Sequence, residues 1–141
     1  MSIGVTLSII GLDKLKKKLQ SKNVTDPLND GVRKATLLLD REVKMATVVG
    51  TAESTGIPGY VGGRLRSSMT SQFGAGFGQV GTNVVYAPIV EFGAGNMQAR
   101  HMEGGTKVLG EGMFAFGLRK LTSKMKDLLG DIANAIETRW K

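Results

Sequence analysis

Cysteine is missing from this chain of 141 residues, and histidine occurs once, as His101. The lack of cysteine excludes a disulfide framework and a thiolate metal site, and it fits folding in a reducing cytoplasm. A histidine-based triad would need His101, and a metal site would need carboxylates arranged around it. The sequence shows neither arrangement, so we expect no metal and no cofactor.

The chain also lacks long apolar runs. The stretch from Phe73 to Val90 carries no charge, but it is full of Gly, Gln, Thr and Asn, and no basic region followed by a long apolar core stands at the amino terminus. The sequence therefore predicts neither a membrane span nor a signal peptide. No GxSxG elbow occurs, and Gly104-Gly105-Thr106-Lys107 lacks the order of a phosphate-binding loop. We predict that the protein is not an enzyme.

Positive charge is in excess, with a formal net charge of +7. Most of the excess lies in the first 22 residues, where five lysines accompany Asp13. Such a cluster can reach phosphates, although on a surface helix it is more often a solvated face. Both interpretations stay open for Lys14, Lys16, Lys17 and Lys18.

Glycine is abundant, with 20 residues, about twice ordinary usage. The glycines concentrate in the middle of the chain and predict two long surface loops, at about 50–63 and 94–113. The second region has the alternative of a loose hairpin in which Lys107, Val108 and Leu109 form a strand. Loops this long in a small domain tend to bind something or to await a partner that orders them.

Apolar periodicity predicts a single domain over residues 1–141 with an α+β fold, in which a small antiparallel sheet packs against two long helices. The apolar stripe of the last helix should close one face of the sheet. The expected elements are a strand at 3–9, a short amphipathic helix at 12–19, a long helix opened by Thr25-Asp26-Pro27, a helical turn at 64–68, strands at 69–73 and 78–82, a short helix at 86–92 and a long helix at 118–140.

The short helix at 86–92 has recognisable ends. Asn83 is a candidate cap, Pro88 suits the first turn, and Gly93 suits a left-handed stop. The apolar side chains expected to be mostly buried are Tyr86, Ile89, Val90 and Phe92.

Arg64 and Arg66 lie two residues apart and suit a phosphate, or a carboxylate on another subunit. The plainer interpretation is a local ion pair or a solvated turn. Glu91 stands among apolar residues, where a carboxylate must face solvent or find a cation. We therefore expect Glu91 to pair with Arg64 or Arg66, within one chain or across subunits.

Three patches of sequence resemble a known family. They are Gly63-Arg64-Leu65-Arg66-Ser67-Ser68, the stretch from Val80 to Gly95 that reads VGTNVVYAPIVEFGAG, and Met113-Phe114. Together they resemble the small neck and tail-completion proteins of long-tailed bacteriophages, including tail-terminator-like proteins. The chain departs from the family where Gly112 precedes Met113-Phe114 without a proline, and in extra glycine around 94–112.

The resemblance implies a virion protein that is a monomer when free and forms a ring at the head-tail junction or tail top, beside connector and tail-tube proteins, after assembly in the host cytoplasm. A hexamer is favoured, with twelve copies as the alternative. DNA would pass through the lumen, which makes Lys14, Lys16, Lys17 and Lys18 candidate DNA-facing residues. Candidate subunit-interface residues are Arg64, Arg66, Glu91, Arg100, His101 and Lys107. The alternative function is a small basic DNA-binding protein.

Overall fold

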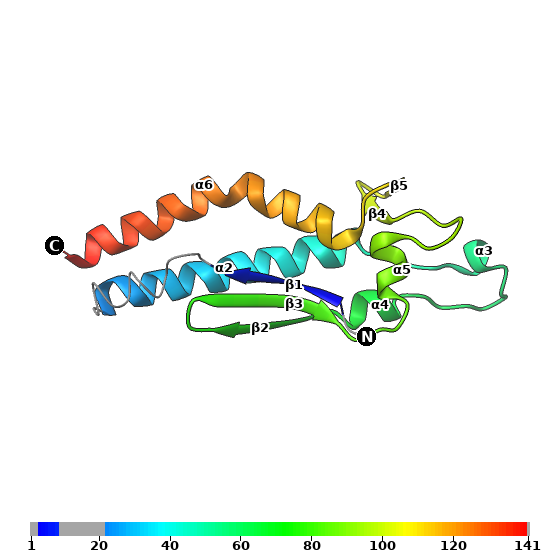
Figure 1. Ribbon diagram of the computed structural model, residues 1–141, viewed down its shortest axis with the longest axis horizontal. Helices are drawn as coiled ribbons and strands as arrows, with labels where there is room; N and C mark the ends of the chain where they lie inside the picture. The colour runs from blue at the N-terminus through cyan, green and yellow to red at the C-terminus, as the bar shows by residue number, and fades with distance from the viewer. Residues whose placement is uncertain (1–2, 9–21, 141) are drawn as a thin grey trace.

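The computed structural model describes residues 3–8 and 22–140, and these form the predicted α+β fold (Figure 1). The helix expected at 12–19 lies outside the described residues. The elements in chain order are β1 (Ile3–Ser8), α2 (Lys22–Ala46), α3 (Ala52–Thr55), α4 (Arg64–Ser67), β2 (Thr70–Gly74), β3 (Phe77–Thr82), α5 (Ala87–Phe92), β4 (Arg100–Glu103), β5 (Thr106–Leu109) and α6 (Met113–Trp140).

The main sheet is antiparallel, with the strand order β1-β3-β2. Val5 is opposite Val80, and Val80 is opposite Ser71 on the other side. Because side chains alternate between the faces of a strand, Val80 points into the core, while its neighbour Gln79 stands on the outer face. The sheet therefore buries one face and leaves a polar face outside.

Glycine at position 78 allows α2 to lie close to the sheet. A Cβ atom added to Gly78 would lie 1.6 Å from Oγ1 of Thr36, a fully buried residue of α2. The Thr36 hydroxyl donates instead to the carbonyl of Val32, at 2.8 Å within the same helix. The hydroxyl is thereby satisfied without a partner from the sheet.

Helix α2 lies between the sheet and α6 (Figure 1). Its predicted stripe is confirmed, since these side chains are all buried: Leu28, Val32, Ala35, Leu39, Val43 and Ala46. The predicted start at Thr25-Asp26-Pro27 was wrong, because the helix already includes Lys22 and holds Pro27 inside it. Val24 packs with Leu28 and with Ile132 of α6, and this burial favours the longer helix although proline removes a helical hydrogen bond.

Helix α6 runs antiparallel to α2 and packs mainly along it, with far less contact to β1 of the sheet (Figure 1). The expectation that its stripe would close a face of the sheet was wrong in this respect, because α2 covers that face. Two glycines let the helices approach: an added Cβ would lie 2.3 Å from Ile132 Cδ1 at Gly31, and 2.7 Å from Val43 Cγ2 at Gly117. Close helix contact of this kind requires residues without side chains at the crossing.

The two glycine-rich regions lie at the end of the molecule away from the carboxyl end of α6 (Figure 1). Residues 50–63 hold only the single turn α3 and an isolated bridge between Thr51 and Val61. Residues 94–113 form a hairpin of β4 and β5, which confirms the strand alternative for this region. Helix α5 lies between the two regions.

Candidate assembly interface

Glu91 forms an internal cap. It is 7% exposed, and its two carboxylate oxygens accept hydrogen bonds from the backbone N–H groups of Phe114, at 2.8 Å, and Ala115, at 3.0 Å. These amides belong to the first turn of α6, where N–H groups have no helical partner and the helix dipole favours a negative charge. The predicted pair between Glu91 and an arginine of the same chain was therefore wrong, because the carboxylate is held by a helix end. The cap also leaves Glu91 little surface to offer another copy.

Glycine at position 112 makes this cap fit. A Cβ atom on Gly112 would lie 2.2 Å from Oε2 of Glu91. The cap joins α5 to α6 across more than twenty residues of sequence, so no local sequence pattern predicts it. It fixes the orientation of α5 relative to the core.

Arg66 also binds a helix end. Its Nη2 donates to the carbonyl of Thr47 at 3.0 Å, just after the last residue of α2, where a cation is favoured by the helix dipole. Arg64, on the same turn α4, is exposed, and so is much of Arg66. The bond to Thr47 fastens the Arg66 guanidinium to the end of α2 within its own chain.

His101 is an interior residue, with 1% of its surface exposed. Its ring stacks on Phe116, with ring centres 4.2 Å apart, and its Nδ1 lies 2.8 Å from the carbonyl oxygen of Glu111. Because that carbonyl can only accept, Nδ1 must carry the hydrogen. Nε2 faces the Glu103 carboxylate at 3.6 Å. The burial of His101 contradicts its selection as a contact with another subunit.

Exposed apolar side chains gather at the end that carries α3, α5 and the hairpin, and we call this surface the apolar end (Figure 1). Val85 is 82%, Phe92 is 74% and Val61 is 90% exposed. The residues that make up the apolar end are Ile57, Tyr60, Val61, Val85, Tyr86, Ile89, Phe92, Met97 and Leu109. The prediction that Tyr86, Ile89 and Phe92 are buried was wrong, whereas Val90 is buried as predicted.

The face of α5 explains this error. The helix has six residues, and it turns Ala87, Val90 and Glu91 toward the core. At 3.6 residues per turn, Ile89 and Phe92 then lie on the opposite side. The predicted Asn83 cap was also wrong, since the N-cap is Tyr86 with no side-chain bond, while the early proline is confirmed. Gly93 ends the helix with a positive φ of 80°, but its ψ of 170° lies outside the left-handed helical region, so the predicted left-handed stop was wrong.

A cavity of about 760 Å³, which we call the loop cavity, opens within the apolar end. Residues of the long loop, of α5 and of the hairpin line it, among them Tyr60, Val90 and Met102, together with Leu65 of α4. Arg100 and Lys107 line it as well, and in the described part of the chain these two cations are the charged residues of the lining. The structure thus brings these two predicted interface residues to one site. Arg64 and Arg66 stand in α4, on either side of the lining residue Leu65.

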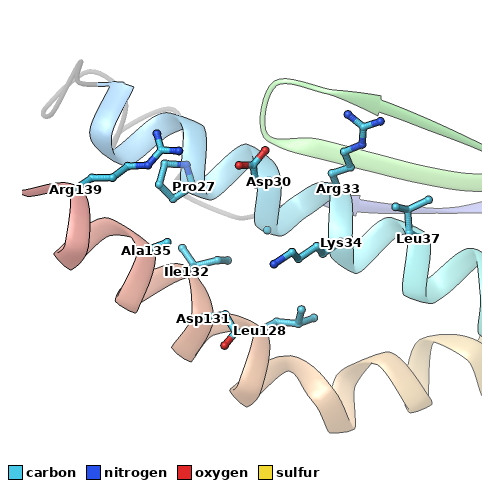
Figure 2. A pocket seen from close by; sticks show the side chains of 11 residues that line it. Pro27, Asp30, Arg33, Lys34, Leu37, Leu128, Asp131, Ile132, Ala135 and Arg139 are labelled. Atoms are coloured by element: carbon cyan, nitrogen blue, oxygen red, sulfur yellow. The ribbon is translucent and has the colours of Figure 1, made fainter.

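A smaller groove of about 260 Å³ lies between α2 and α6 (Figure 2). Most of its lining residues belong to the first half of α2 and the second half of α6, at the end of the molecule away from the apolar end (Figure 1). Ile132 and Leu128 of α6 face α2 across it, and charges of both signs surround it. The mixture of charge favours no one class of ligand. We regard this groove as a consequence of how the two helices diverge.

Two short motifs in the sequence have functional precedents, and the structure gives neither of them a suitable setting. Residues Gly76 to Gly81 read G-x-G-x-x-G, which binds nucleotides where it links a strand to a helix. Here the motif runs through β3, which is paired on both sides. Ser123 to Lys126 read S-x-x-K, a spacing found in some serine hydrolases, but both side chains are exposed on α6.

Over residues 3–8 and 22–140, no group of three or more His, Asp or Glu side chains is placed to hold a metal. In the same part of the chain, no helix has the length and apolar character needed to cross a membrane. The lysine cluster Lys14, Lys16, Lys17 and Lys18 lies outside the described residues. No family model, curated protein or solved structure matches the chain.

Proposed function

We propose that this protein is a structural component of a bacteriophage virion that acts as a homo-oligomeric ring at the head-tail junction or tail top, with DNA passing through its lumen. A hexamer is the favoured state, and twelve copies matching a connector are the alternative. The proposal needs no catalysis and no cofactor, because a ring of this kind acts by its shape. Its partners are further copies of the chain and the neighbouring connector and tail-tube proteins.

The observation that carries the proposal is the apolar end. Soluble monomers rarely expose contiguous apolar patches larger than a few hundred Å², and larger ones mark interaction sites. Here nine large apolar side chains, each at least 38% exposed, come from the long loop, from α5 and the residues just before it, and from the hairpin and the residues just before it, and several of them line one cavity. Self-association would bury part of this surface. The resemblance of the 63–68 and 80–95 patches to phage neck and tail-completion proteins supplies the context of a virion.

Imaging of purified virions tests the proposal directly. We expect a ring below the connector that disappears from particles made without this gene and returns when the gene is supplied in trans. Mass spectrometry of the same particles should detect the protein. Virions that contain none of it would exclude the proposed role.

Electrophoretic mobility shift with duplex DNA over a salt series separates the proposal from the alternative of a small basic DNA-binding protein. DNA must move through the lumen of the proposed ring, so we expect the protein to bind duplex DNA weakly. Submicromolar affinity that falls steeply with salt would favour the DNA-binding alternative, because such dependence measures phosphates neutralised by the protein.

A further inference from the structure

We propose that the outer side of the 51–61 loop of one copy docks into the loop cavity of the next copy. This inference rests on the self-association of the proposed function, but not on its place in a virion. The occupant is a second copy of this chain, and the contact joins two different surfaces.

The lining of the loop cavity is suited to bind an apolar segment that carries a negative charge. Its lining includes Tyr86, Met97 and Leu109, which are 40%, 52% and 56% exposed and supply apolar surface. Arg100 and Lys107 add two positive charges, and no carboxylate lines the cavity among residues 3–8 and 22–140. An acidic partner group near an apolar side chain would complement both features.

The 51–61 loop has the matching character. Ile57 and Val61 are 54% and 90% exposed, and neither belongs to the lining of the loop cavity. Glu53, also exposed, is the single charged residue between Lys44 and Arg64. The loop thus presents apolar side chains beside one carboxylate.

The loop is already shaped for docking. Thr51 and Ser54 form a capping box, in which the Thr51 hydroxyl accepts from the Ser54 N–H at 3.1 Å and the Ser54 hydroxyl accepts from the Thr51 N–H at 2.8 Å. The bridge between Thr51 and Val61 closes the base of the loop. A preformed segment loses less entropy on binding than a flexible one.

The same copy does not fill its own cavity with these side chains. Thr51, Ser54 and Tyr60 of the loop line the cavity, while Ile57 and Val61 do not. One side of the loop therefore forms a wall of the cavity, and the other side is free for another copy. Because the donor and acceptor surfaces differ, each copy can receive one neighbour and offer itself to another, and such a heterologous contact generates a ring when the rotation closes.

Disulfide trapping tests the docking, and the natural absence of cysteine makes the background clean. Val61→Cys places a thiol on the docking side of the loop, and Leu109→Cys places one at the lining of the cavity. Oxidation of an equal mixture of the two full-length variants should give a linked dimer. Each variant alone should give much less linked dimer, because the proposed contact never brings the same surface of two copies together.

Charge reversal supplies the second measurement. We expect Glu53→Lys to weaken self-association about three- to tenfold, measured by sedimentation of the full chain over a concentration series. Adding Lys107→Glu to the same chain should restore part of the loss. Asp127→Lys, an equal change of charge on the exposed surface of α6, is the matched control and should have less than a twofold effect.

The outcomes separate this inference from the function on which it rests. Self-association without a linked dimer in the mixture would overturn the docking and leave a ring possible through another surface. Efficient disulfide formation between two copies of the Val61→Cys variant would also overturn the docking proposal. So would native mass spectra that show a small molecule retained in the loop cavity. A chain that does not self-associate in sedimentation and forms no ring in virions would refute both proposals.

Discussion

Replacing Glu91 by Gln removes the negative charge from the cap of α6 and changes little else in shape. The carboxylate holds two backbone N–H groups, at 2.8 and 3.0 Å, and each charge-assisted bond of this kind contributes about 1.5 to 3 kcal/mol. Glutamine keeps one acceptor and turns an NH₂ group toward the other amide, which leaves one neutral bond of about 1 kcal/mol. We therefore expect Glu91→Gln to lower the free energy of unfolding by about 2 to 5 kcal/mol.

Urea unfolding followed by far-ultraviolet circular dichroism measures this loss at a protein concentration where the chain is monomeric. The midpoint should fall with an unchanged m-value, and Tm should fall by roughly 8 to 20 °C at about 4 °C per kcal/mol. Glu53→Gln, at an exposed carboxylate, is the control and should change stability by less than about 0.5 kcal/mol. A Glu91→Gln protein as stable as the control would refute the cap as a source of stability.

A double-mutant cycle with Gly112 tests whether the loss comes from this contact. Gly112→Ala places a Cβ 2.2 Å from Oε2 of Glu91, so the carboxylate must move away from the amides. Both single changes then damage the same interaction. The double variant should lose less stability than the sum of the two, by about 1 kcal/mol or more, whereas independent sites would add.

Three further changes separate packing from assembly. Gly78→Ala should lower the free energy of unfolding by about 1 to 3 kcal/mol in urea, because its Cβ would overlap Oγ1 of Thr36, and the loss should shrink in a Thr36→Ala background. Gly130→Ala, in α6 with open space around it, should raise stability by about 0.5 to 1 kcal/mol in the same assay, and a loss would contradict the exposure of this position. Phe92→Ser should leave the urea midpoint unchanged but weaken self-association in sedimentation about fivefold or more. Leu129→Ser, at an apolar residue of α6 that is 52% exposed, should not weaken it, and equal effects of the two changes would exclude a special role for the apolar end.

The sequence was sufficient for the long elements. The stripes of α2 and α6 repeat over several turns, so a period of 3.6 residues is distinguishable from noise, and alternation over 3–8 marks β1 with similar clarity. What the stripe of α6 could not reveal is its partner. An apolar face demands burial against some surface, and only the tertiary arrangement decides that α2 rather than the sheet provides it.

The buried face of α5 could not be predicted from its local sequence. The helix is shorter than two turns and apolar on both sides, so no period tells which side is buried. The sequence predicts a cationic partner for Glu91, and this prediction is wrong. The actual partners are free backbone amides of α6 that lie more than twenty residues away in the sequence. A helix cap supplied by a residue distant in the sequence produces no recognisable spacing of residues, so the sequence does not predict it.

The cap and the exposed face of α5 together change how Glu91 should be tested. The carboxylate of Glu91 ties α5 to the start of α6, and the next residue, Phe92, extends outward from the same helix. Reversing the charge with Glu91→Lys would place a cation against the N-terminus of α6 and would disturb the orientation of α5 before any subunit contact was reached. A loss of assembly in that variant would therefore report on the fold. Substitutions on the outward side of α5, or on the 51–61 loop, change the surface without touching the cap, so the subunit contact should be sought there.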